Sequence, residues 1–318
     1  MTALSTGGSV PEPPAEGSLP QKEARFHDAW AAGTRLDDVP VEVALEAITA
    51  PENRFILERM GDLRGKRVLD VGAGLGETSV YFALRGAEVT MVDVSPQMVD
   101  FAVRLGRSRG VEITGLVSAA EDINVDCDHY DFAYMANLLH HVDDRDRVLE
   151  RVRAALKPGG WIFTWDPIAY NPVINVYRGL ASKVRTPDER PLTRVDVERM
   201  RQHFCAVGHR EFWILSLAVF LKYYFVDRLD PNEVRYWKRI LKDHDRMPVW
   251  FNWLQAADRV LASVPGVRWL AWNIVLWGQK PAIAHGGEKP PSAEHTVNTK
   301  QRDGTEEHNH DLTRPAAS

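Results

Sequence analysis

A glycine-rich turn directly after an apolar strand constrains this chain more than any other feature of its sequence. Residues 68–77 read Val-Leu-Asp-Val-Gly-Ala-Gly-Leu-Gly-Glu, so alternate glycines separate a strand pattern from a helix pattern. Glycine has no Cβ and tolerates positive φ angles, which lets the backbone bend sharply and lets a ligand lie directly on the peptide groups. The turn therefore predicts a ligand-binding site at the start of the following helix.

The spacing of the glycines indicates which ligand the turn can hold. A dinucleotide-binding turn reads G-x-G-x-x-G, and its last glycine would stand where this chain has Glu77, whose carboxylate would repel a pyrophosphate. Asp93 follows a second apolar strand, at a position from which a carboxylate can accept two hydrogen bonds from a ribose diol. The two features favour a nucleoside ligand without a pyrophosphate and disfavour a nicotinamide enzyme.

Further motifs follow the turn in order: Ala119-Ala120-Glu121-Asp122, Tyr130-Asp131-Phe132, Asn137-Leu138-Leu139-His140-His141 and Leu156-Lys157-Pro158-Gly159-Gly160. With the turn, they make residues 66–165 similar to the class I S-adenosylmethionine-dependent methyltransferases, and among these to the branch that includes the quinone-biosynthesis methyltransferases. The rest of the chain resembles the family loosely. The resemblance implies an α/β fold, a doubly wound, seven-stranded, mostly parallel sheet of Rossmann-like type with helical insertions, and S-adenosylmethionine as cofactor.

Apolar runs that alternate with helical patterns indicate βαβ units by themselves. The predicted strands are at about 66–71, 88–93, 112–117, 131–136 and 160–165. One helix follows the glycine turn to about residue 86, and Ser95 with Pro96 predicts the start of another. By resemblance, 212–218 and 269–277 would complete the sheet as a reversed hairpin.

The remaining residues divide into insertions and tails. Residues 168–210 and 222–265 are predicted helical insertions, and Thr193 with Asp196 predicts a capping box inside the first. Residues 1–21 and 283–318 cannot bury enough apolar surface to offset chain entropy, so we expect both to be disordered around one domain, 22–282. The tail histidines are interpreted as solvated side chains rather than metal ligands: His285, His295, His308 and His310.

Composition narrows the class of protein. A net charge of −5 argues against a nucleic-acid binder, which would carry a basic excess. Cys127 and Cys205 are expected to be reduced thiols, and the residues suggest no metal set. The N-terminus lacks a signal-peptide pattern and no stretch reaches the ~18 apolar residues of a membrane span, so we expect a cytoplasmic protein without a spanning helix.

The resemblance assigns cofactor contacts along the strand ends. Asp70, Gly72, Ala73, Gly74 and Gly76 would lie at the methionine part, Asp93 at the ribose, Val94 and Met98 at the adenine, Glu121 or Asp122 at the adenine amine, and Asn137 at the end of the fourth strand. Ordinary helix packing is the alternative for Val94 and Met98. Solvated side chains are the alternative for the two acids.

The candidate catalytic residues follow the fourth and fifth strands. His140 and His141 offer imidazoles, the commonest general base near neutral pH, and Asp166 lies at the same predicted sheet edge. A structural role at a helix start is the alternative for His141. The acceptor pocket is predicted from Tyr170, Asn171 and Tyr177, and the charged stretch 185–192 is either a salt-bridged loop or an acceptor clamp.

Aromatic residues mark two other segments. By resemblance, the helix with Phe26 and Trp30 would close over the cofactor, and a peripheral amphipathic helix is the alternative. Tryptophans dominate the chain beyond residue 212, where they suit a core, an apolar acceptor pocket or a membrane surface.

The sequence thus predicts an enzyme that moves a methyl group from S-adenosylmethionine to an oxygen, carbon or nitrogen of a small, partly apolar or lipid-like metabolite. Peripheral membrane contact is an option, and no oligomeric state is predicted. The alternative is a non-catalytic protein of the same fold that binds cofactor or lipid as a pathway scaffold.

Overall fold

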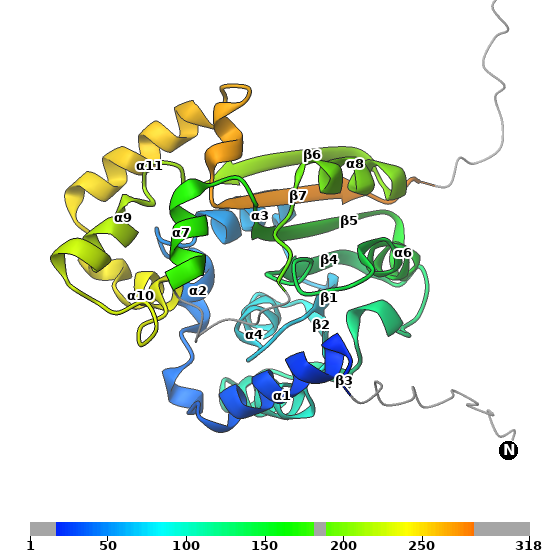
Figure 1. The fold of residues 1–318 in the computed structure, drawn as a ribbon. Helices are drawn as coiled ribbons and strands as arrows, with labels where there is room; N and C mark the ends of the chain where they lie inside the picture. The colour runs from blue at the N-terminus through cyan, green and yellow to red at the C-terminus, as the bar shows by residue number, and fades with distance from the viewer. Residues whose placement is uncertain (1–16, 181–188, 283–318) are drawn as a thin grey trace, which may run out of the picture. The chain divides into compact units, whose positions relative to one another are not determined.

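The computed structural model describes residues 17–180 and 189–282, and within them a single sheet has the strand order β3-β2-β1-β4-β5-β7-β6 (Figure 1). The strands are β1 (Arg67–Val71), β2 (Glu88–Asp93), β3 (Thr114–Val117), β4 (Tyr130–Ala136), β5 (Leu156–Pro167), β6 (Cys205–Phe212) and β7 (Asn273–Gln279). Neighbouring strands from β3 to β5 pair in parallel, whereas β7 pairs antiparallel with both β5 and β6. The predicted seven-stranded, mostly parallel α/β sheet is confirmed.

Helices connect the strands and cover both faces of the sheet. The α-helices are α1 (Leu19–Ala32), α2 (Val41–Glu46), α3 (Pro51–Met60), α4 (Glu77–Leu84), α5 (Pro96–Ser108), α6 (Arg145–Ala155), α7 (Pro172–Leu180), α8 (Arg194–His203), α9 (Ala218–Leu221), α10 (Tyr236–Lys242) and α11 (Val249–Leu261). A π-helical turn, η4 (Lys222–Val226), continues α9, and short 3-10 turns are η1 (Leu36–Asp38), η2 (Ala120–Asp122), η5 (His244–Arg246) and η6 (Val267–Leu270). No helix of the described residues is long and apolar enough to cross a bilayer.

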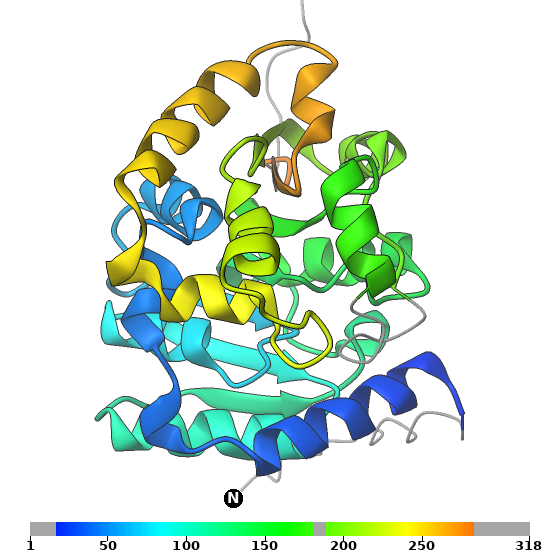
Figure 2. The same ribbon diagram turned by 60° about the vertical axis from the view of Figure 1, so that its left-hand side comes forward.

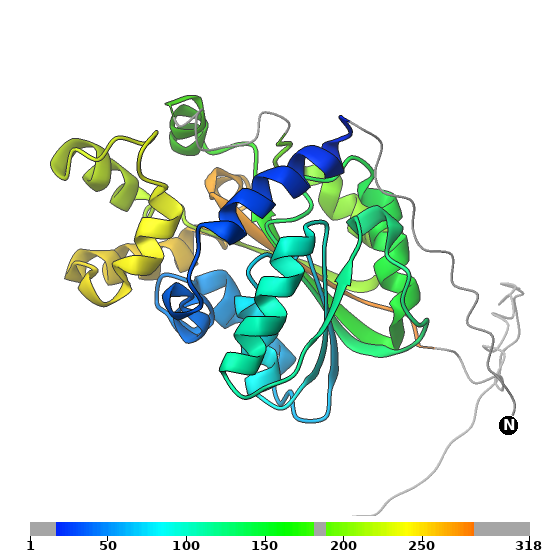
Figure 3. The same ribbon diagram turned by 90° about the horizontal axis from the view of Figure 1, so that it is seen from below.

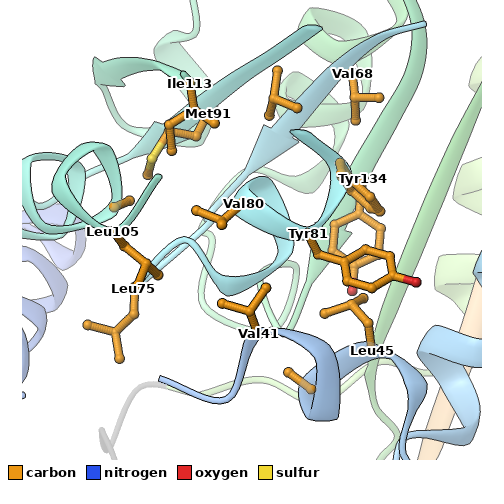
Figure 4. Close-up of a cluster of buried hydrophobic side chains, with 14 of the residues drawn as sticks. Val41, Leu45, Val68, Leu75, Val80, Tyr81, Met91, Leu105, Ile113 and Tyr134 are labelled. Carbon is orange, nitrogen blue, oxygen red and sulfur yellow. The ribbon is translucent and has the colours of Figure 1, made fainter. Parts of the chain in front are cut away.

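Two apolar clusters hold the sheet between its helical layers. On one face α3, α4 and α5 pack on the strands, and Figure 4 shows part of this cluster, with Val68 of β1, Val80 of α4 and Leu105 of α5. On the other face α6 and α8 pack around Val148, Leu149 and neighbouring residues. Helix α1 lies along α5 (Figure 3). Packing on both faces therefore holds the carboxyl ends of the strands in fixed positions.

Local signals fix the helix starts as predicted. The Ser95 hydroxyl accepts a hydrogen bond from the Met98 N–H at 3.0 Å, which caps α5. The capping box of Thr193 and Asp196 is present at α8, so that prediction is also confirmed. Cys127 and Cys205 are exposed free thiols.

The last two strands lie elsewhere than predicted. The strand expected at 212–218 is instead β6, which ends at Phe212, so the predicted insertion 168–210 overlaps the sheet. The strand expected at 269–277 is β7, which begins at Asn273 after a 3-10 turn. β6 is an edge strand with few fully buried residues, so it lacks the apolar run used to recognise strands.

The apolar run after β6 packs into a separate cluster instead. Trp213, Leu217, Phe220 and Tyr223 are buried there with residues of α7, α10 and α11. These helices and α9 gather on one side of the sheet, to the left in Figure 1 and toward the viewer in Figure 2. The segment 222–265 contains η4, α10, η5 and α11 with a non-helical stretch at 227–235, and α1 begins at Leu19, inside the stretch expected to be disordered.

Candidate active site

A cavity of about 380 Å³ lies at the carboxyl ends of β1, β2, β4 and β5. This volume falls within the roughly 300–1,000 Å³ of small-molecule sites. Its walls come from the glycine-rich turn, the segments after these strands, α1, and the inserted helices α7 and α10. Open α/β sheets bind ligands where the strand order reverses, which here is between β1 and β4.

The three glycines of the turn have different structural roles. All have positive φ angles, and Gly72 and Gly74 line the cavity whereas Gly76 does not. A Cβ on Gly74 would meet nothing within 4 Å, so this face of the backbone is open to a ligand. A Cβ on Gly76 would lie 2.3 Å from the Cβ of Ala102, so Gly76 permits close packing of α4 on α5. Ala73 also lines the cavity.

Asp93 ends β2 and lines the cavity with a buried carboxylate. One carboxylate oxygen accepts a hydrogen bond from the Gly74 N–H at 2.9 Å, and the other accepts one from the Ser95 N–H at 2.9 Å. Burial raises the pKa of Asp93, and the bonds from these backbone amides oppose the rise. The carboxylate therefore braces the glycine turn as well as facing the cavity.

Two further acids lie beneath the turn. Asp70 at the end of β1 is buried, lines the cavity and accepts a 2.6 Å hydrogen bond from the Ser79 hydroxyl. Burial raises the pKa of Asp70 to about 7, and the charges of Glu77 and Asp93 add to the rise. Burial also raises the pKa of Glu77, whose Oε2 has no hydrogen-bond partner among the described residues. Three buried acids beside the turn, Asp70, Glu77 and Asp93, favour a cationic ligand.

The residues predicted at the adenine divide into two groups. Val94 and Glu121 line the cavity. Met98 packs inside the core, which is the helix-packing alternative. Asp122 lies outside the cavity, half-exposed, and accepts a 2.5 Å hydrogen bond from Arg147. Of the two alternatives for the adenine amine, only Glu121 faces the cavity.

Asn137 follows β4 with a φ of 52°, a left-handed conformation that asparagine tolerates better than most residues. Its N–H donates to the Trp165 carbonyl at 2.8 Å, which ties the ends of β4 and β5 together. The residue lines the cavity, as predicted from its place at the strand end.

His140 and Asp166 form a buried pair. Their Nδ1 and Oδ1 atoms are 2.8 Å apart, and the His140 N–H donates to the same oxygen at 3.2 Å. Thr164 donates its hydroxyl to the other carboxylate oxygen at 3.0 Å. Burial raises the pKa of Asp166 to about 7 despite these hydrogen bonds. His140 lines the cavity while Asp166 lies wholly behind it, so the carboxyl group orients the imidazole.

His141 lies beside His140, with ring centroids 4.0 Å apart. Its Nδ1 is 3.3 Å from a carboxylate oxygen of Glu23 on α1, which also pairs with His27 at 3.5 Å. Burial alone would raise the pKa of Glu23, but bonds with both histidines lower it to about 2. Ligand atoms of His140, His141 and Glu189 lie within 4.8 Å of one another, the one such grouping in the described residues.

The predicted acceptor residues do not all reach the cavity. Tyr177 lines it, whereas the Tyr170 hydroxyl accepts a hydrogen bond from the Arg194 N–H outside it. Asn171 caps α7, since its side-chain oxygen accepts from the Ile174 N–H. Both therefore support structure rather than the cavity wall. Of the charged stretch 185–192, residues 185–188 lie outside the described residues, as do the tail histidines.

The aromatic residues considered from the sequence divide among the cavity wall, the exposed surface and the apolar clusters. Phe26 and Trp30 of α1 line the cavity. The same holds for Trp213, Trp237 and Trp272, while Trp250 and Trp253 are exposed and Trp269 and Trp277 pack against the sheet clusters.

The cavity wall contains a buried carboxyl group that the sequence did not predict. Glu52 of α3 accepts a 2.6 Å hydrogen bond from the Asn273 side chain and another from Trp213, and burial raises its pKa to about 7. Glu52 and Asn273 are 221 residues apart in the chain. No local pattern brings them together, and only a carboxylate within an otherwise apolar helix face could have hinted at the site.

Comparison with known proteins shows what the segment that contains the glycine-rich turn is similar to. Residues 68–160 match the model of the methyltransferase domain. A ubiquinone biosynthesis O-methyltransferase of Bordetella avium is 35% identical over 120 residues, which are 37% of this chain and 50% of that protein. The chain thus spans about half the length of the curated relatives it matches. The predicted resemblance to the methyltransferases is confirmed for this segment.

Solved structures share the fold over a longer stretch. Phosphoethanolamine N-methyltransferase 2 of Haemonchus contortus, solved with S-adenosyl-L-methionine, is 16% identical with a TM-score of 0.54, covering 84% of this chain and 61% of that one. The cyclase SpnF is 16% identical with a TM-score of 0.53, covering 83% of this chain and 98% of that one. Because a protein named as a cyclase shares this fold, the fold alone does not identify the reaction.

Proposed function

We propose that this chain is an S-adenosylmethionine-dependent methyltransferase that acts on an oxygen, carbon or nitrogen nucleophile of a small, partly apolar or lipid-like metabolite. The observation that carries the proposal is one cavity that joins the open backbone of Gly74 and the carboxylate of Asp93 to the imidazole of His140. The match of residues 68–160 to the methyltransferase domain supports it.

The residues of the cavity fit this cofactor. Gly72, Ala73 and Gly74 line the cavity where we place the methionine part, with open space over Gly74, and Asp93 offers its carboxylate to the ribose hydroxyls. Val94 and Glu121 are placed for the adenine, and Asn137 extends the same wall. Three residues predicted as cofactor contacts do not line the cavity: Gly76, Met98 and Asp122. We assign them supporting roles in the structure around it.

Charge also favours this cofactor. Asp70 and Glu77 are buried acids beside the turn, and a ligand that carries an ammonium and a sulfonium would let both ionise without an uncompensated charge. When bound, S-adenosylmethionine supplies a methyl group already activated by its positive sulfur. The protein therefore has to align the acceptor and exclude water.

His140 is the proposed proton acceptor. A hydrogen bond from Nδ1 to Asp166 leaves Nε2 as the lone-pair nitrogen, which can take a proton from a hydroxyl or amine nucleophile. Asp166 does not reach the cavity and acts by orienting this ring. His141 is held by Glu23 of α1, so it joins the covering helix to the segment after β4.

Aromatic rings line the part of the cavity in which we place the methyl acceptor, which we call the acceptor half. Tyr177, Trp213 and Trp272 line it, and they give an apolar metabolite a surface on which to stack. Glu52 and Asn273 place one hydrogen-bonding group among these rings. This composition supports a partly apolar acceptor with a polar group.

Calorimetry and a turnover assay test the proposal together. We expect S-adenosylhomocysteine to bind with a Kd in the micromolar range or tighter, and NAD to bind at least tenfold more weakly. Release of S-adenosylhomocysteine is then followed across fractionated metabolite extracts. Cofactor binding without release from any fraction would support the scaffold alternative, and tighter binding of NAD would contradict the cofactor assignment.

We also propose peripheral contact with a membrane surface, for a protein located in the cytoplasm. Val249, Trp253 and Val260 form an apolar stripe along α11 and are 75%, 73% and 67% exposed. Flotation with vesicles of phosphatidylethanolamine and phosphatidylglycerol tests the stripe. Trp253→Ser should reduce the bound fraction several-fold, and Val195→Ser on α8, at a position that is 63% exposed, should not.

A further inference from the structure

Two basic side chains of the α10 segment face α1 across the edge of the cavity. The Arg235 guanidinium carbon lies 5.3 Å from the ring centre of Phe26 and 5.7 Å from that of Trp30. The Lys238 ammonium lies 3.5 Å from the ring centre of Trp30 and 5.2 Å from that of Trp237. Aromatic faces thus surround both cations.

Neither cation forms a close ion pair with a carboxylate of the described residues. Within residues 17–180 and 189–282, no carboxylate oxygen lies within 4.0 Å of the Arg235 guanidinium or the Lys238 ammonium. Burial lowers the pKa of Arg235, and burial followed by repulsion from Arg235 lowers the pKa of Lys238 to about 8. Both groups have lost part of their hydration, and the rings replace it only in part.

The position of this pair relative to the acids is informative. Arg235 lines the cavity together with Phe26, Trp30 and Trp237. Lys238 is close enough to Glu77, at the start of α4, for their charges to interact. The cavity therefore has carboxylates beneath the glycine turn and cations on the opposing helix, an arrangement that suits a ligand with separate positive and negative groups.

We propose that Arg235 in the cavity wall and Lys238 beside it form a carboxylate-binding site at the edge of the cavity, capped by Phe26 and Trp30. This inference rests on the proposed function. The carboxylate belongs either to the amino-acid part of the cofactor or to the acceptor, and a guanidinium beside an ammonium would hold either one by charge-assisted hydrogen bonds. The site makes α10, which belongs to an insertion, part of ligand recognition.

Binding measurements with two pairs of probes test the site and identify its ligand. The first pair is S-adenosylhomocysteine and its decarboxylated analogue, which keeps the amine. The second pair is 4-hydroxybenzoate and 4-hydroxybenzamide, measured with and without S-adenosylhomocysteine. We expect Arg235→Gln and Lys238→Gln each to weaken the acid of one pair about tenfold or more and its uncharged or decarboxylated partner less than twofold.

The outcome in each arm is decisive. Loss confined to S-adenosylhomocysteine assigns the site to the cofactor, and loss confined to the benzoate assigns it to the acceptor. Equal weakening within both pairs, or no weakening in either, overturns the proposal and leaves the two cations as a clamp between α1 and α10. Wild-type protein that binds the benzoate but no S-adenosylhomocysteine would refute the proposed function while retaining the site. Wild-type protein that binds none of the acids would overturn both.

Matched variants separate recognition from folding. Lys242→Gln removes an exposed cation from the same helix and should leave every Kd unchanged. Arg235→Lys should recover most of the preference for the acid in whichever pair responds, because it restores the charge. Melting temperatures of all variants identify any that lose affinity by unfolding.

Discussion

The carboxylate of Asp93 accepts a hydrogen bond from the Gly74 N–H at 2.9 Å and so joins the end of β2 to the glycine-rich turn that follows β1. This contact gives one side chain two tasks. It holds the shape of the turn, and it faces the cavity in which we place the ribose. Changes at Asp93 should therefore affect both stability and cofactor affinity.

Asp93→Ala should weaken binding of S-adenosylhomocysteine about 10- to 150-fold, because hydrogen bonds to a charged acceptor contribute about 1.5–3 kcal/mol. It should also lower the melting temperature, since the Gly74 and Ser95 amides lose their acceptor. Calorimetry and thermal unfolding measure the two effects. Asp131→Asn is the control, because Asp131 accepts from the Arg67 N–H at the opposite end of the sheet and should leave affinity unchanged. An unaltered Kd in folded Asp93→Ala would remove the ribose assignment.

Gly74→Ala and Gly76→Ala should have opposite profiles. Both place a side chain on a left-handed backbone, at a cost of about 1–2 kcal/mol. Gly76→Ala adds a clash with Ala102 and should lose about 1–3 kcal/mol more in the free energy of unfolding. The methyl group added by Gly74→Ala enters open space. Relative to the stability that each variant loses, Gly74→Ala should therefore weaken cofactor binding more than Gly76→Ala. Denaturant titration and calorimetry on both variants test this, and identical profiles would contradict the separation of roles.

The glycine turn also shows what sequence could predict. The positions of β1 to β5 along the chain and the two capping signals followed from apolar runs and local spacing, because these signals lie within a few residues. The pattern also placed His140 and Asp166 at the same sheet edge, since parallel strands bring their carboxyl ends together. It did not separate Gly74 from Gly76, because the direction in which a Cβ would point depends on how α4 packs on α5.

Residues that meet through the insertions could not be predicted. Glu52 and Asn273 come together only when α3 packs on β7, and the Arg235 and Lys238 cations meet α1 through an insertion of irregular helices. The edge strand β6 was missed for a related reason. One of its sides faces solvent, so its burial pattern is set by tertiary position rather than by a periodic sequence.

The buried acids predict a pH dependence of cofactor binding. Burial raises the pKa of Asp70 to about 7, from an unfolded value near 3.8, so the folded protein without cofactor binds more protons between these values than the unfolded chain. Its contribution to stability is therefore present at low pH and is lost as the pH rises toward 7. A cationic cofactor favours the ionised form, so its affinity should increase as the pH rises through about 7.

Calorimetry from pH 6 to 8 in buffers of different ionisation enthalpy should thus show proton release on binding of S-adenosylmethionine. Asp70→Asn should reduce this release and flatten the pH dependence of the Kd. Glu52→Gln is the comparison, because burial raises the pKa of Glu52 to a similar value but it lies among the aromatic rings of the acceptor half. Equal effects of the two variants would contradict the assignment of Asp70 to the cationic part of the cofactor.

Removal of metal ions should not change turnover. The sequence predicts no metal site, and we propose that the His140 imidazole acts as a base, although ligand atoms of His140, His141 and Glu189 lie within 4.8 Å of one another. Dialysis against a chelator, followed by addition of Mg²⁺, Mn²⁺ or Zn²⁺, measures this directly. Loss of turnover that one of these ions restores would assign the three residues to a metal site instead.

His140→Gln and Asp166→Asn should lower turnover far more than they weaken cofactor binding. A positioned general base contributes about 10²- to 10⁴-fold, so His140→Gln should lose activity in that range when the acceptor keeps its proton until transfer. Asp166→Asn should lose less, because an amide oxygen can still accept from the imidazole but cannot stabilise its charged form. The measurement is kcat at saturating cofactor beside the Kd for S-adenosylhomocysteine.

The matched control is another histidine–aspartate pair. The Nε2 of His203 on α8 lies 3.0 Å from a carboxylate oxygen of Asp146 on α6, and neither residue lines the cavity. His203→Gln should therefore cost some stability and leave kcat unchanged. If His140→Gln and Asp166→Asn both keep full kcat on the true acceptor, then either the nucleophile carries no proton or the acceptor enters elsewhere. An acceptor bound beside Glu52 and Trp213 would then be the next arrangement to test, because those residues place a buried carboxyl group within the same cavity.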